Sequence, residues 1–238
     1  MRFSAITGAA TMAAALTLVL TGCGSDTESE PTTSASETAT TSSTTSAKAA
    51  PSTAKVAPRE EDAAGPNPTI ASYIAENNIQ ETPVRRGDPG APTIDLPFPE
   101  GWEDAGADTP EWAYGAIVYN GPEAAEYTPS IVAIVSKLTG NVDPQAIIDL
   151  APGELQNLPG WSAMNEGETS TLGEYPAYQL GGTWESEGQT KLVAQKTVVI
   201  PGPDGVYVLQ LNADALEDQA DLVGPATMAI DEETTISF

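Results

Sequence analysis

The sequence predicts an α+β fold, in which a central antiparallel sheet is flanked by helices. From about residue 68 onward, the expected order is a helix, several strands, a second helix, a run of consecutive strands and a third helix. Consecutive strands joined by short turns form antiparallel sheets, and amphipathic helices then cover the faces of the sheet. No glycine-rich phosphate loop follows any strand-like stretch, so a doubly wound nucleotide-binding fold is not predicted.

The N-terminus has the features of a bacterial lipoprotein signal peptide, predicted to span residues 1–22. A positive charge at Arg2 precedes an apolar run over residues 9–20 that is too short to cross a bilayer. Residues 20–23, Leu-Thr-Gly-Cys, match the lipobox pattern, in which the cysteine thiolate accepts diacylglycerol. The alternative is an ordinary signal peptide with a chance cysteine. The single cysteine of the chain lies at the position that the motif requires, so Cys23 is the predicted lipidation site.

Residues 23–67 are expected to form a lipidated, disordered tether, followed by one globular domain over residues 68–238. The tether is rich in Ser, Thr, Ala and Pro and lacks aromatic residues, so it cannot bury enough surface to repay the cost of ordering. A flexible chain of this length reaches roughly 35–40 Å. Ser52 and Lys55 match a Ser-x-x-Lys nucleophile motif, but a catalytic role is not expected outside a rigid pocket.

The first half of the domain is expected to contain two helices and three strands. Asn67 is a favourable N-cap and Pro68 a favourable first residue for the first helix. Asp143 is expected to cap the second helix, which should kink or restart at Pro152-Gly153. Strands are expected over residues 94–98, 112–120 and 130–138. In the second strand, one face should carry four residues: Trp112, Tyr114, Ala116 and Val118.

The second half is expected to contain four consecutive strands and a final helix. A hairpin turn over residues 201–205 should join the last pair of these strands: 161–172, 175–185, 191–200 and 206–213. Asp214 is expected to cap the final helix, with a kink at Gly224-Pro225. Residues 234–238 should close the chain in an extended form.

The charge and composition exclude several classes of function. The chain of 238 residues carries 34 acidic and nine basic residues and no histidine. A formal charge of −25 argues against nucleic-acid binding, which requires Lys and Arg to displace counterions from phosphates. Without histidine there is no Ser-His-Asp or Cys-His catalytic arrangement and no His-containing metal site. We therefore expect no metal, no cofactor and no enzymatic activity.

Several segments resemble the LpqN-type lipoproteins of mycobacteria and related actinobacteria. The lipobox and the Ser/Thr/Pro-rich tether are followed by "TIASYIAENNIQETPVRRGDPGAPTIDLPFPEGW", "GWSAMNEGETSTLGEYPAYQLGGTW" and the ending "DEETTISF". The turn Pro99-x-Gly101-Trp102 after a short strand is also similar to PsbP-like domains. The resemblance runs from about residue 69 to the end of the chain and implies a PsbP-like sandwich fold.

The resemblance implies a role in the cell envelope and not a reaction. Members of this family are expected to assist MmpL-type exporters of trehalose-linked lipids and to hold a glycolipid or acyl chain in a pocket. The implied location is the extracytoplasmic side of the cell membrane, where two or three acyl chains on Cys23 would anchor the protein. No binding residue can be transferred from the family to this chain.

The candidate ligand-binding residues are aromatic, because sugar-headed lipids are bound by stacking over apolar depth. They are Trp184, beside the glycine pair at residues 181–182, and the further residues Trp112, Tyr114 and Tyr178. Packing in the core explains each of them as well.

Three groups of charged residues suggest other chemistries. Glu185 and Glu187 share a strand face, as paired carboxylates do in glycoside hydrolases, although a solvated strand end is the simpler interpretation. The acidic run over residues 231–233 lacks the spacing of a calcium loop. Arg85-Arg86 could hold a phosphate or balance the acidic surface. Two alternatives to a lipid carrier therefore remain: a carboxylate-based hydrolase of cell-wall glycan, and a structural or antigenic surface protein without ligand.

Overall fold

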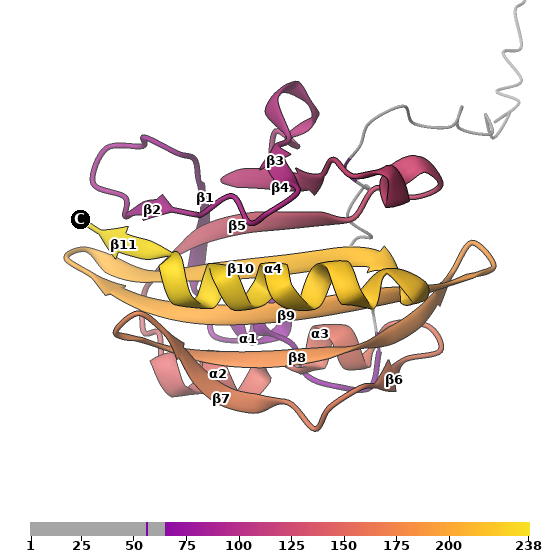
Figure 1. The fold of residues 1–238 in the computed structure, drawn as a ribbon. Coiled ribbons are helices and arrows are strands. Elements are labelled where there is room, and N and C mark those ends of the chain that lie inside the picture. Colours follow the sequence, from indigo (N-terminus) through magenta and orange to yellow (C-terminus); the bar gives the residue numbers. More distant parts are fainter. Residues whose placement is uncertain (1–55, 57–64) are drawn as a thin grey trace, which may run out of the picture. The chain divides into compact units, whose positions relative to one another are not determined.

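In the computed structural model, Val56 and residues 65–238 are described, and they form an α+β domain, as the sequence predicts (Figure 1). The helices are α1 (Ile70–Glu76), α2 (Pro144–Leu150), α3 (Gly153–Gln156) and α4 (Ala220–Glu233), with 3-10 turns η1 (Gly106–Asp108), η2 (Pro122–Ala125) and η3 (Glu217–Gln219). The predicted signal peptide, Cys23, Ser52 and Lys55 lie outside the described residues. None of the helices in the described part of the chain has the length and apolar character needed to span a bilayer.

The described residues form one large antiparallel sheet and one small one. The large sheet has nine strands in the order β3-β4-β5-β10-β9-β8-β6; in addition, β1 pairs with β5 and β7 pairs with β8. Its strands are β1 (Gln80–Val84), β3 (Trp102–Asp104), β4 (Gly115–Tyr119), β5 (Ser130–Thr139), β6 (Ser162–Ala163), β7 (Glu168–Leu172), β8 (Tyr175–Ser186), β9 (Gln189–Gly202) and β10 (Gly205–Leu216). The small sheet pairs β2 (Thr93–Asp95) with β11 (Thr235–Ser237), which confirms the extended C-terminus.

Helices cover both faces of the large sheet. Helix α4 crosses one face, and α1, α2 and α3 lie on the other (Figure 1). The main core lies under α4, where Tyr207, Leu209 and Leu211 share a face of β10 with their side chains buried. On the opposite face, Val208 packs with residues of α2. This alternation follows from the period of two along a strand, which places neighbouring residues on opposite faces.

The ends of the helices confirm one predicted cap and correct two others. Asp143 caps α2 by accepting from the backbone N–H of Gln145, at 2.9 Å. The N-cap of α1 is Thr69 and not Asn67, because Thr69 and Ser72 bond reciprocally across the first turn. Asn67 instead bonds with Asn157, which follows α3. As predicted, the chain restarts a helix after Pro152.

Asp214 does not cap the last helix. Strand β10 continues to Leu216, and Asp214 pairs in register with Ser130 on one side and Val193 on the other. The pairing of both edges of β10 extends the strand beyond the point where the local sequence favours a cap. Helix α4 then begins after Gln219 and includes Pro225 in its interior.

Three further strand predictions differ from the structure. The stretch 161–172 is divided into β6 and β7, and the left-handed Gly167 lies between them. The short strands β1 and β3 were not predicted. Strand β4 begins only at Gly115, and Tyr114 lies in the main core with α4, whereas Ala116 and Val118 pack on the opposite face. The four residues expected on one face are therefore distributed over two.

The packed unit includes residues of the predicted tether, among them Asn67, which bonds with Asn157, and Val56. Val56 is buried in a cluster with residues of β4 and β5, among them Val118 and Val132. Residues before position 68 thus contribute to the core of the domain.

Candidate functional site

A groove lies on the face of the sheet that carries α1, α2 and α3. Its first part has a volume of about 240 Å³ and adjoins a second hollow of about 560 Å³, with which it shares Ile134 and Glu154. The second hollow is bounded by Ile70 and Ile74 of α1. We call the two parts together the α3 groove. The combined space is within the range of pockets that hold ligands of several hundred daltons.

Part of the lining of the α3 groove is apolar. Leu155 in α3 and Leu158 just after it form one side, and Val132 and Ile134 of β5 form the other. Val193 of β9 also lines it. These side chains are placed by the alternation of the strands and by the helical restart at Gly153, where a Cβ atom would lie 1.9 Å from the carbonyl oxygen of Pro68. Glycine at position 153 therefore allows α3 to approach the start of α1.

Polar side chains line the central part of the same groove. The Gln195 amide donates to Asn212 Oδ1 at 2.8 Å and to Glu154 Oε2 at 3.3 Å. Gln210 donates to the same Glu154 oxygen at 3.2 Å. Two buried donors, Asn212 Nδ2 and Trp184 Nε1, have no hydrogen-bond partner among the described residues. An unsatisfied buried donor costs about 1–3 kcal/mol, and an oxygen of a bound molecule would recover this cost.

Lys191 and Asp214, which line the groove, form a cluster with Tyr127. The Tyr127 hydroxyl donates to the Asp214 carboxylate, and the Lys191 ammonium lies 3.3 Å from the same hydroxyl. The Lys191 ammonium also lies 4.9 Å from the centre of the Tyr127 ring and 5.8 Å from that of Trp184. Burial raises the pKa of Asp214, while Tyr127 and Lys191 oppose the shift. Burial and the nearby Asp214 raise the pKa of Tyr127.

The structure brings together two of the four predicted aromatic residues. Trp184 lines the α3 groove and is 6% exposed, and Trp112 lines it at 36% exposure. Tyr178 packs nearby under the helices but does not line the groove. Tyr114 is buried on the opposite face, where its hydroxyl accepts from the backbone N–H of Ile94 and donates to the carbonyl of Pro92.

The glycine pair beside Trp184 does not form a mouth of this groove. A Cβ atom on Gly182 would lie 2.4 Å from the Trp161 ring, so Gly182 is needed for close packing. Gly181 lines a different hollow, on the α4 face of the sheet.

The other candidate residues have local partners. Arg85 donates to the carbonyl of Trp112, and the Arg86 guanidinium lies over the Tyr114 ring at 5.4 Å. Asp231 pairs with Lys196 at 2.7 Å. Glu185 accepts from Thr190, and Glu187 lies in the β8–β9 turn with a left-handed φ of 52°. Within the described part of the chain, no group of three or more potential ligands is placed to hold a metal ion.

The polar side of the groove was not predicted from the sequence. The residues concerned are Gln195, Lys191, Asn212, Gln210 and Asp214. A signal was present, because Gln210, Asn212 and Asp214 recur with a period of two along an otherwise apolar strand. Such a pattern usually indicates a solvated face, and only the position of α3 reveals that these residues lie inside a groove.

Asp214 makes the stability of the domain depend on pH. Because its pKa is higher in the folded chain than in the unfolded one, the folded chain binds the proton more tightly. We expect the free energy of unfolding of the native chain, relative to that of Asp214→Asn, to fall as the pH rises from about 4 through the raised pKa. Urea denaturation of both chains across this range measures the difference in the free energy of unfolding. The contributions of the other carboxylates are the same in both chains and cancel in this difference. A difference that does not vary with pH would contradict the conclusion that burial raises the pKa of Asp214.

Comparisons with known proteins identify a family. Residues 66–237 match the family model Lpp-LpqN, described as "Probable lipoprotein LpqN". The chain is similar to "Lipoprotein LpqN" of Mycobacterium tuberculosis, with 54% identity over 96% of this chain and 97% of the relative. A "Proline-rich 28 kDa antigen homolog" of Mycobacterium leprae is 25% identical over 71% of this chain and 60% of its own length. The crystal structure of LpqN "involved in cell envelope biogenesis" of M. tuberculosis superposes with a TM-score of 0.69, at 52% identity over 73% of this chain and 100% of the other.

Proposed function

Because the chain belongs to the Lpp-LpqN lipoprotein family, we propose that it is a cell-envelope lipoprotein that holds one acyl-chain glycolipid in the α3 groove without transforming it. The observation that carries this proposal is the combination of apolar walls with buried hydrogen-bond donors that lack a partner. An acyl chain gains free energy from the contacts with Leu155, Leu158 and Ile134, at about 25 cal/mol per Å² of apolar surface removed from water. Sugar oxygens would accept from Trp184 Nε1 and Asn212 Nδ2.

The geometry favours a particular orientation of the ligand. The polar head would lie at the end of the groove that contains Trp184, Lys191 and Asp214. The acyl chain would run towards the hollow under α1, past Ile134. A neutral head group with many hydroxyls suits this end better than an anionic one, because Asp214, Glu154 and Glu187 also line it.

The proposed role requires the protein to be held near the membrane. In this proposal Cys23 carries the lipid anchor, on the extracytoplasmic side of the cell membrane, and the tether keeps the domain close to its source of lipid. Tethering raises the effective concentration at that surface. The partner proposed to supply the lipid is an extracytoplasmic domain of an MmpL-type exporter. The similar LpqN protein of M. tuberculosis is described as involved in cell envelope biogenesis, which is consistent with such a role.

A hydrolase is the second candidate, because four carboxylates line the same groove: Glu81, Glu154, Glu187 and Asp214. Three of them are already engaged: Glu81 accepts from Ser136, Glu154 accepts from Gln195 and Gln210, and Asp214 accepts from Tyr127. The chain also lacks histidine, the usual base near neutral pH. We therefore propose a carrier and not a catalyst.

Mass spectrometry of the chain purified from its native envelope distinguishes these functions. A carrier would co-purify with about one intact glycolipid per chain. Free sugar or free fatty acid that appears on incubation of the complex would indicate the hydrolase. A chain that carries no lipid, and that takes up none from an envelope extract, would contradict the carrier.

The unpartnered indole of Trp184 provides a specific test of the head-group site. Trp184→Phe keeps an aromatic ring but removes the Nε1 donor, so we expect binding of a trehalose monoester to weaken about 3–10-fold, as the loss of one hydrogen bond does. Trp161→Phe is the matched control, because Trp161 does not line the groove. Both variants can be compared by calorimetry. Equal affinities of the two variants would exclude the indole as a ligand contact.

A further inference from the structure

The outward side of α4 has an unusual composition for a surface helix. Its buried side chains, Val223, Ala226 and Ile230, pack into the main core. Exposed residues recur at helical spacing along the opposite side, and five of them form what we call the α4 stripe: Asp221, Gly224, Pro225, Met228 and Glu232. Its centre is apolar, and its ends carry carboxylates.

Two residues of the α4 stripe oppose helix formation without a packing reason. Proline in a helix interior costs about 3 kcal/mol relative to alanine, and glycine costs about 1 kcal/mol. A Cβ atom on Gly224 would meet nothing within 4 Å, so close packing does not require glycine there. Pro225 is likewise exposed. Residues that oppose the local secondary structure without improving packing or stability are typical of functional surfaces.

A hollow adjoins the α4 stripe at Met228. It has a volume of about 230 Å³ and lies between α4 and the sheet, on the face opposite to the α3 groove. Gly181, Ala194 and Ala213 line it from three adjacent strands, where they lie in register across β8, β9 and β10. Small side chains at these three positions leave room for one side chain from outside.

The charge around the hollow indicates what kind of occupant it accepts. Residues 217–233 contain six acidic residues and no basic one. Lys196, at the edge of the hollow, is neutralised by Asp231, 2.7 Å away. A second copy of this chain and an anionic lipid surface would both be repelled, whereas a cationic protein segment would be attracted.

We propose that the α4 stripe and its hollow form a docking surface for a basic segment of a partner protein, which inserts one aliphatic or aromatic side chain beside Met228. The apolar centre of the stripe provides the anchor site, and the terminal carboxylates pair with flanking Lys or Arg. Methionine suits such a site because its flexible side chain adapts to different apolar partners. This inference does not rest on the glycolipid proposal, since the two sites lie on opposite faces of the sheet.

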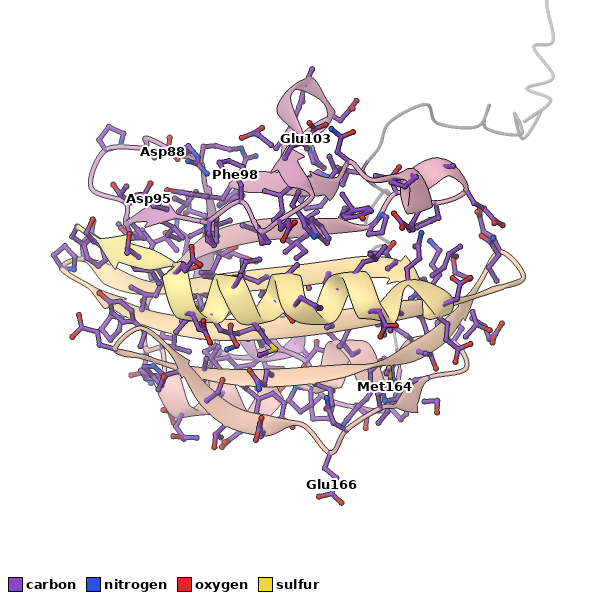
Figure 2. The ribbon with its side chains drawn as sticks, in the orientation of Figure 1. Asp88, Asp95, Phe98, Glu103, Met164 and Glu166 are labelled. Carbon is purple, nitrogen blue, oxygen red and sulfur yellow. The ribbon has the colours of Figure 1, made fainter. Side chains whose placement is uncertain are left out.

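The test uses the full mature chain and a fluorescein-labelled peptide of 14 residues that carries Lys at both ends and one central Leu. Fluorescence polarisation at low ionic strength should show saturable binding. Met228→Asp should weaken it at least tenfold, and replacement of the central Leu of the peptide by Ser should weaken it at least fivefold. Phe98→Asp is the matched control, because Phe98 is 58% exposed, lies in the segment between β2 and β3 (Figure 2) and does not line the hollow beside Met228. It adds the same charge and should change binding less than twofold.

The size of the Met228→Asp effect, set against that of Phe98→Asp, distinguishes docking from general attraction between opposite charges. An added carboxylate would strengthen purely electrostatic binding, so a loss supports the apolar anchor. A second variant, Gly224→Ala combined with Pro225→Ala, should raise the melting temperature of the chain but weaken its binding of the peptide at least threefold. Absence of binding, equal binding of the Leu and Ser peptides, or unchanged binding by Met228→Asp would each overturn the proposal. Leu158→Asp, which alters the α3 groove, should leave peptide binding unchanged.

Discussion

Replacing Leu209 with alanine is expected to lower the free energy of unfolding by about 2–5 kcal/mol. Leu209 is completely buried in the middle of β10, between Val135 of β5 and Val198 of β9. Its side chain belongs to the main core under α4. Truncation would lose the transfer free energy of three carbon atoms and would leave a cavity that close-packed neighbours on three strands cannot easily fill.

Urea denaturation of the mature chain measures this effect, with Thr169→Ala as the control. Thr169 is exposed on β7, so its truncation should change the free energy of unfolding by no more than about 0.5 kcal/mol. Similar losses for the two variants would show that the core is not centred on β10 and α4.

Replacing Leu158 with aspartate is expected to weaken the binding of a trehalose monoester about 30-fold or more. Leu158 forms part of the apolar wall of the α3 groove but is only partly buried, so the fold should tolerate the change. An acyl chain laid against this wall would remove the new carboxylate from water, and burial of an unpaired charge is strongly unfavourable.

Phe98→Asp is again the matched control, since it adds one carboxylate to an exposed loop outside the groove. The fluorescence of Trp184 and Trp112, both of which line the groove, can report the binding. Circular dichroism before each titration confirms that the variant is folded. Undiminished affinity in a folded Leu158→Asp chain would place the ligand elsewhere.

The long strands were predictable because the local pattern and the tertiary environment agree. Strands β5, β8, β9 and β10 contain long runs of alternating or continuous apolar residues, and each lies inside the sheet. Strand β1 has the sequence Gln-Glu-Thr-Pro-Val and is mostly exposed. It exists because the second half of β5 offers a free edge beyond β4, and no local signal predicts such a pairing.

The predicted helix cap at Asp214 was wrong, and this one error affected both the predicted end of β10 and the prediction of the site. An aspartate after an apolar strand and before a helical pattern resembles an N-cap. Asp214 pairs with both β5 and β9, and β9 carries β10 two residues further. The carboxylate lines the groove, where it meets Tyr127. Tyr127 is 87 residues away along the chain. Local sequence cannot show a contact of that range.

The aromatic part of the site was predicted better than its polar part. Tryptophan is informative by itself, and Trp184 and Trp112 both line the groove. Tyr114 was expected on the same face as Trp112, but β4 begins only after it, so its side chain enters the opposite core. The sequence pattern alone indicates that Gln195 and Asn212 face solvent. They lie inside the groove because α3 packs over this face of the sheet.

Calorimetric titration of the mature chain with a trehalose monoester tests the central claim most directly. We predict saturable binding of one ester per chain, with a negative heat-capacity change from the burial of the acyl chain and no release of free sugar or fatty acid. Trehalose alone should bind far more weakly, because it lacks the apolar part that contacts Leu155 and Leu158. Absence of saturable binding below the concentration at which the ester forms micelles, or equal affinity for trehalose and its ester, would contradict the assignment of the α3 groove as a glycolipid site.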